Sequence, residues 1–93
     1  MLHKFLVHAK QDSVGIAVED IRAGETVQGV VLDDESPVTV KALQDIPLGH
    51  KIALISMTQG ATVREYGEPI GKVVVSIKPG EHVHVHNLKS TRW

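Results

Sequence analysis

The sequence contains no cysteine and very few aromatic residues, and each shortage excludes a class of protein. Without cysteine, the 93-residue chain has neither a disulfide framework nor a thiolate zinc site, and we expect a reducing, cytoplasmic environment. Phe5, Tyr66 and Trp93 are the only aromatic residues, too few for a platform that stacks nucleic-acid bases.

Charge and hydropathy exclude two further kinds of partner. Ten basic and eleven acidic residues give a net charge of −1, whereas nucleic-acid binding needs a concentrated positive field. No apolar run approaches the ~18 residues that span a bilayer, so we expect no membrane partner.

β-branched residues, by contrast, are abundant. The chain contains fourteen Val, seven Ile and five Thr, which lose rotamer freedom in helices and pack well on pleated surfaces. Because a chain this short forms one core, we predict a single all-β domain over residues 1–93.

One eight-residue turn motif recurs four times: polar, apolar, two variable residues, Gly, two variable residues, apolar. We expect the first apolar residue to enter the core, the glycine to take a positive φ, and the last residue to open a strand. Uneven spacing excludes a regular solenoid and favours a small, irregular, barrel-like fold. The copies are Asp20–Val27, Asp45–Ile52, Ser56–Val63 and Ser76–Val83.

The runs between these turns predict eight strands. A short helix over Val18–Ile21 is an alternative at one point, and Asp33–Pro37 is predicted to be a solvated hairpin loop. The predicted strands are Lys4–His8, Val14–Glu19, Val27–Leu32, Val38–Ala42, Lys51–Ile55, Thr62–Arg64, Lys72–Ser76 and His82–His86.

The last of these strands alternates His and Val and carries the clearest chemical signal. In a strand, His82, His84 and His86 would share one face, with neighbours about 7 Å apart, and Val83 and Val85 would anchor the other face in the core. The imidazoles are candidates for metal ligation, for acid–base work or for hydrogen bonds to an anionic substrate. A polar face on an edge strand is the structural alternative.

Two further segments carry candidate ligand contacts. Lys51, after the Gly49 turn, can bind a carboxylate, phosphate or sulfonate through charge-assisted hydrogen bonds, although a solvated surface lysine is the commoner case. Tyr66 can present its hydroxyl at a pocket rim, beside a Gly-flanked loop that is otherwise a structural turn. The sequence has no nucleophile elbow, phosphate-binding glycine loop or paired catalytic carboxylates, so it lacks a self-sufficient catalytic apparatus.

Three segments taken together resemble one protein family. Asp45–Ala53, Tyr66–Gly71 and Gly80–Asn87 are similar to the N-terminal SAF-type domain of altronate and galactarate dehydratases, and to the small alpha subunit of sulfolactate sulfo-lyase. The resemblance covers essentially the whole chain, with its motifs in order. It implies a β-clip fold.

The resemblance also implies a role in a lyase that removes water, or sulfite in the sulfo-lyase, from a small hydroxy-acid anion. In such enzymes a much larger domain or subunit supplies most of the machinery, and the dehydratases depend on a divalent metal, typically iron. Carried onto this chain, the candidate contacts are His50, Lys51, Tyr66 and Asn87 for the substrate, and His82, His84 and His86 for the metal. The resemblance leaves open the alternative that the three histidines contact the substrate.

The start at Met1 and the tail ending in Trp93 favour a separate small subunit with a large catalytic partner over a piece of a longer chain. A non-catalytic module that binds sugar acids and a purely structural assembly domain are the alternative functions. The oligomeric state is left open, with a homo-oligomer as one option for the isolated chain.

Overall fold

The computed structural model describes residues 3–90, which form two β-sheets. It confirms the all-β prediction: residues 3–90 contain no helix, so the alternative of a helix over Val18–Ile21 is wrong, and no helix in this range could cross a membrane. The strands are β1 (Phe5–Val7), β2 (Val14–Ala17), β3 (Thr26–Val31), β4 (Pro37–Lys41), β5 (Lys51–Ala53), β6 (Thr62–Glu65), β7 (Glu68–Val73), β8 (His82–Val83) and β9 (Leu88–Ser90).

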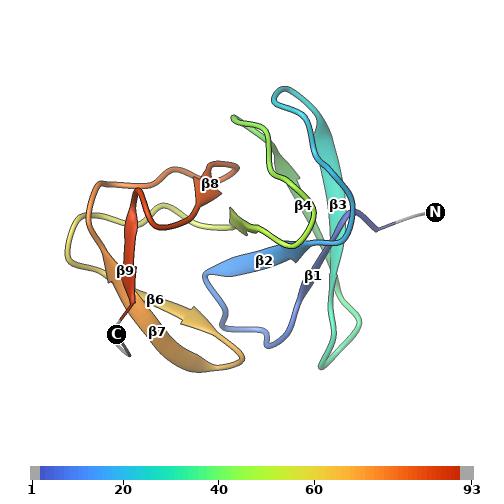
Figure 1. Cartoon of the computed structure of the whole chain (residues 1–93). Helices are drawn as coiled ribbons and strands as arrows, with labels where there is room; N and C mark the ends of the chain where they lie inside the picture. The colour runs from blue at the N-terminus through green and yellow to red at the C-terminus, as the bar shows by residue number, and fades with distance from the viewer. Residues whose placement is uncertain (1–2, 91–93) are drawn as a thin grey trace.

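The larger sheet has the order β4-β3-β1-β2-β5-β8, and the smaller has the order β6-β7-β9. All strand pairs are antiparallel except β1 with β3. In Figure 1 the smaller sheet lies on one side, β1 to β4 lie on the other, and β8 lies above the space between them. The curled arrangement agrees with the expected barrel-like SAF-type fold.

The four predicted turns are present, and they associate in two reciprocal pairs. The anchors Ile21 and Ile46 form an antiparallel bridge with backbone bonds of 2.9 and 2.8 Å, and Met57 and Ile77 do the same. All four anchors are buried. The repeat therefore builds the centre of the molecule.

Each motif glycine has a positive φ, and its N–H donates to a carbonyl that lies four residues before the anchor of the paired motif. The backbone groups left over by each turn are thus satisfied by its partner turn. The four bonds are Gly24 to Ala42, Gly49 to Ala17, Gly60 to Val73 and Gly80 to Ala53.

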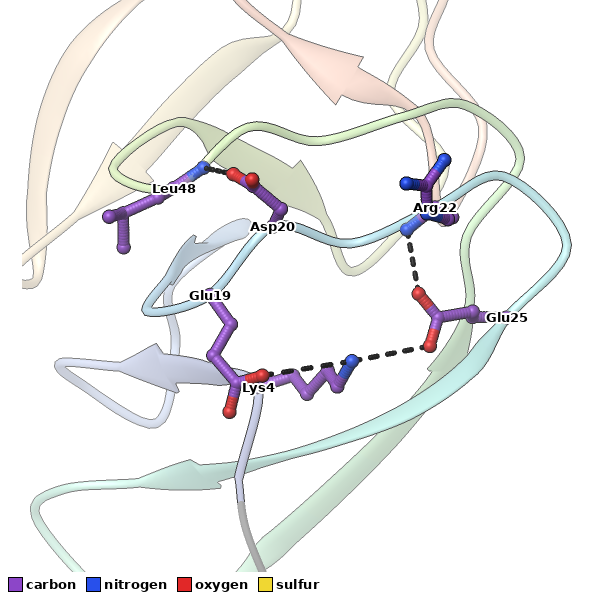
Figure 2. A network of polar contacts seen from close by, with 6 residues as sticks. All are labelled: Lys4, Glu19, Asp20, Arg22, Glu25 and Leu48. Carbon is purple, nitrogen blue, oxygen red and sulfur yellow. Dashed lines mark hydrogen bonds and ion pairs between the residues drawn. The ribbon is translucent and has the colours of Figure 1, made fainter.

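The polar first residue of a motif completes this exchange. Asp20 accepts the N–H of Leu48 at 2.8 Å (Figure 2), and Asp45 accepts the N–H of Ala23 at 2.8 Å. Ser76 accepts from Gln59 in the second pair. The fourth bond of this kind cannot form because Pro79 has no N–H.

A polar network secures the first motif against the start of the chain. Lys4 pairs with Glu25 at 3.3 Å and with Glu19 at 3.8 Å, and Glu25 also accepts the N–H of Arg22 (Figure 2). These contacts lower the pKa of Glu25, chiefly through the Arg22 backbone bond and then through Lys4.

Two hydrophobic clusters fill the interior, one for each pair of turns. The first contains Phe5, Ile21 and Ile46, and the second contains Met57, Ile77 and Val83. β5 joins them, because Ile52 packs in the first cluster and the adjacent Ala53 packs in the second.

Two strand predictions are wrong near the C-terminal end. β7 covers Glu68–Val73 and not Lys72–Ser76, because a two-residue turn at Tyr66–Gly67 folds it back on β6. The last histidine strand stops at Val83, and a turn then leads to β9, which the sequence did not predict. The Asp33–Pro37 loop is confirmed up to Pro37, which begins β4.

Gly80 and Gly24 provide a matched test of the paired turns, because they occupy the same motif position with φ of 90° and 92°. A Cβ on Gly80 would lie 1.9 Å from the Lys41 carbonyl oxygen, whereas one on Gly24 meets nothing within 4 Å. We expect Gly24→Ala to lower the free energy of unfolding by about 1 kcal/mol through φ strain alone, and Gly80→Ala by about 3 kcal/mol or more. Urea denaturation measures both, and equal losses would contradict the close packing at Gly80.

Candidate functional site

The C-terminal histidines lie on a turn and only partly on a strand. Val83 is fully buried as predicted, but Val85 is 82% exposed, so the prediction that both valines anchor a continuous strand is wrong. The physical reason is Asn87, whose Oδ1 accepts the N–H of His84 at 2.9 Å while its Nδ2 donates to the carbonyl of His82 at 2.8 Å. The amide of Asn87 closes the turn.

The turn nonetheless brings imidazoles together, and it adds one from elsewhere. His50 precedes β5, and β5 pairs with β8 so that Ile52 lies opposite His82. His50 Nδ1 lies 2.8 Å from His82 Nε2, and the His50 and His84 rings stack with centroids 4.6 Å apart. We call His50, His82 and His84 the histidine group.

His86 lies beside this group. Its ring centroid is 5.4 Å from that of His82, and the two rings are tilted by 42°. The set of three residues whose ligand nitrogens all lie within 4.8 Å of one another contains His50 in place of His86. The prediction of His82, His84 and His86 as metal ligands stays a prediction, and the geometry adds His50 to the candidates.

Burial and the neighbouring imidazoles favour the neutral form of His82. The pKa of His82 lies below its ordinary value, first because burial disfavours the imidazolium and then because His50, His86 and His84 would repel it. A hydrogen bond between His50 Nδ1 and His82 Nε2 also requires one of these nitrogens to be unprotonated. Neutral imidazoles are the form that binds divalent metals, so this donor set suits such an ion.

Lys51 and Tyr66 lie apart from the histidine group, in an open depression of about 710 Å³. Lys51 pairs across β5 and β8 with the buried Val83, whereas His82 pairs with Ile52. Since adjacent strand residues face opposite sides, the two groups lie on different faces of this sheet. The depression, called here the hairpin depression, is lined by Lys51, Glu65, Tyr66, Glu68, Ile70, Leu88 and Ser90.

Comparison with known proteins assigns the chain to a family. Residues 3–91 match the family described as the altronate/galactarate dehydratase SAF domain. The chain belongs to this family. The resemblance noted in the sequence is thereby confirmed.

Relatives of this SAF domain fall into two kinds. The chain is 43% identical over 90 residues to the (2R)-sulfolactate sulfo-lyase subunit alpha of Chromohalobacter salexigens, covering 96% of both chains. It is 48% identical over 64 residues to the protein of that name from Paracoccus pantotrophus, covering 69% of this chain and 96% of the relative. It is also 38% identical over 89 residues to altronate dehydratase of Bacillus subtilis, covering 96% of this chain but 17% of the dehydratase.

The structure adds supporting residues that the sequence did not single out. Asp12 is buried and accepts the N–H groups of Ala9, Tyr66 and Gly67, which fixes the turn that carries Tyr66. His8, for which the sequence indicated no role, stacks on the Tyr66 ring at 3.8 Å. Their separation of more than 50 residues from Tyr66 hides this contact from local patterns.

The lowered pKa of His82 predicts an acid-sensitive SAF domain. Because its folded pKa lies below the ordinary value of 6.5, the unfolded chain binds the proton more readily, and stability present above pH 6.5 is lost as the pH falls. We expect the free energy of unfolding, measured by urea in chelator, to decrease between about pH 7 and pH 5. His82→Gln should flatten this slope, whereas His3→Gln, an exposed control, should leave it unchanged. An identical slope in His82→Gln would contradict the assignment.

Proposed function

We propose that this SAF domain is the small subunit of a lyase and completes an active site with a larger catalytic chain. The observation that carries the proposal is the match over 96% of both chains to a sulfo-lyase subunit alpha. The same domain covers only 17% and 16% of the length of two altronate dehydratases, so most of each dehydratase lies outside this domain. The histidine group is a site without a complete catalytic set, as a shared active site requires.

The proposed substrate is a small hydroxy-acid anion, and the reaction is elimination. Elimination next to a carboxylate needs a base for the carbon-bound proton and an acid for the leaving group. An imidazole can accept a proton at one ring nitrogen and donate one from the other, and His50 and His82 already share one such hydrogen bond. We assign the remaining groups to the larger chain.

We further propose that the histidine group holds a divalent ion, for which iron is the expectation from the family. His50, His82 and His84 would be its ligands in this chain, and His86 would lie next to them. Such an ion, when bound, supplies a positive charge that polarises the leaving oxygen. Ligation by both His50 and His82 would require the proton between them to move to the other nitrogen of its ring. Binding should weaken on acidification because a protonated imidazole has no lone pair for the metal.

The four predicted substrate contacts lie in different places and would have different roles. His50 belongs to the histidine group, and Asn87 would act by holding the turn, since both ends of its amide are bonded to backbone. Lys51 and Tyr66 line the separate hairpin depression.

Water elimination from a sugar acid such as altronate is the first candidate, and sulfite elimination from sulfolactate is the second. The second is favoured by one observation, the matching length of the sulfo-lyase subunits. Both candidates share the subunit role and the histidine group.

Reconstitution tests the proposal. The chain should show no turnover alone, and should restore activity on altronate or on sulfolactate when mixed with its larger lyase chain. We expect His84→Gln to lower kcat of the complex by about 100-fold, since it removes a proposed metal ligand or acid–base group. Assembly with the larger chain should stay intact. Steady-state kinetics and gel filtration measure the two effects, with His3→Gln as the control.

Three results would overturn the proposal. Full-rate turnover by the 93-residue chain alone would show a self-sufficient enzyme. Full activity of the larger chain without it would show no catalytic contribution. Unchanged kcat in a His50, His82 and His84 to Gln triple variant would leave only an assembly role.

A further inference from the structure

The tip of the β6–β7 hairpin contains two features that lower its local stability, a strained tyrosine and a pair of like charges. Tyr66 and Gly67 form a two-residue turn with φ of 58° and 73°, a conformation that favours Asn-Gly and strains a tyrosine. On either side of them, Glu65 and Glu68 are direct cross-strand partners, and like charges in this position repel. Features that lower local stability are expected where a residue has a functional role.

The tyrosine is nevertheless held rigidly. Asp12 accepts the N–H groups of Tyr66 and Gly67, each at 2.8 Å, and the His8 ring stacks on that of Tyr66. The side chain remains 64% exposed. A preorganised, exposed tyrosine loses little entropy on contact, which is the property of an interface anchor.

The carboxylates of Glu65 and Glu68 differ in whether a cationic side chain pairs with them. Glu65 is buried and pairs with Lys51 at 3.9 Å. Glu68 is exposed, and within residues 3–90 no cationic side chain pairs with it. The hairpin depression therefore has one unmatched negative charge beside an aromatic ring, over the apolar side chains of Ile70 and Leu88.

We propose that the hairpin depression docks an arginine-bearing segment of the larger chain. A planar guanidinium stacks flat on an aromatic face and binds a carboxylate through two parallel N–H bonds, whereas an ammonium offers only a point charge and an anion is repelled by the carboxylate. Here it would lie on Tyr66 and pair with Glu68, with Ile70 and Leu88 beneath its stem. The proposal rests on the proposed function only in requiring a larger partner.

This docking would be distinct from the chemistry at the histidine group. Lys51 and the histidine group lie on opposite faces of the sheet at β5 and β8, so occupation of the depression leaves the imidazoles open. A partner that reaches both faces would enclose the edge formed by β8, which pairs with β5 alone.

Amide chemical shifts of the full chain, titrated with acetyl-Gly-Arg-Gly-amide, test the proposal without the partner. We expect saturable shifts at Tyr66, Gly67 and Glu68, with a dissociation constant in the millimolar range that a single anchor supplies. The citrulline peptide, which has the same shape without the charge, should bind at least about fivefold more weakly.

Variants assign the effect to named groups. Glu68→Gln and Tyr66→Asn should each weaken the arginine peptide by about fivefold or more, and Tyr66→Asn should keep the turn because asparagine suits its φ. Glu35→Gln, which alters an exposed glutamate in the β3–β4 loop, should bind normally.

Four outcomes would overturn the proposal. The first is an absence of saturable shifts at the hairpin, and the second is equal binding of the arginine and citrulline peptides. The third is a set of shifts at the hairpin that gluconate or sulfolactate produces and the arginine peptide does not, which would make this a small-anion site. The fourth is binding of the arginine peptide only to the Arg92→Gln variant, which would make the chain's own arginine the occupant. Each result is independent of lyase activity, so its failure is distinguishable from failure of the proposed function.

Discussion

The structure depends on the reciprocal bridging of turn motifs. In each pair, two isoleucines, or a methionine and an isoleucine, are buried back to back while their backbones exchange two hydrogen bonds. A tight turn leaves N–H and C=O groups without partners, and burying them unpaired would cost more than the apolar contact gains. Reciprocal pairing removes that cost, because each turn supplies what its partner lacks. A 93-residue chain can therefore bury the anchor residues of its turns, and not only its strands, in its centre, while most of the turn tips stay at the surface.

This constraint also determines where the chemistry lies. The second motif ends in β5 and the fourth ends in β8. These two strands pair directly, so the residues at the start of β5 lie next to those of β8. His50 reaches His82 in this way, although they are 32 residues apart. The hairpin depression arises on the other side of β5, from Lys51 and the β6–β7 tip. One short strand thus separates a group of imidazoles from a charged, aromatic surface, and the two surfaces suit different tasks.

Much of the fold could be predicted from the sequence because its signals are local. The glycine spacing of the turn motif, and the alternation or β-branching around it, reported all four turns and most strands. The end of β8 could not be predicted in this way, since an alternating His-Val run predicts a strand until the Asn87 amide captures the backbone of the preceding turn. The β6–β7 hairpin was missed in part because Tyr-Gly is not a favoured turn pair.

The candidate site was predictable in its residue types but not in its grouping. His82 and His84 came from the local pattern, whereas His50 joins them only through the pairing of β5 with β8. Asp12, His8 and Glu65 gave no signal, because each acts through a contact distant in sequence. The family assignment supports the lyase role, but the division into two surfaces comes from the geometry alone.

We propose that His50, from one turn, and His82 and His84, from another, form a single metal-binding group. X-ray absorption at the zinc edge of the full chain loaded with one equivalent of Zn²⁺ can test this grouping. We expect about three imidazole nitrogens near 2.0–2.1 Å, and the loss of one in His50→Gln. Scattering from oxygen alone, or a spectrum that His50→Gln leaves unchanged, would contradict it.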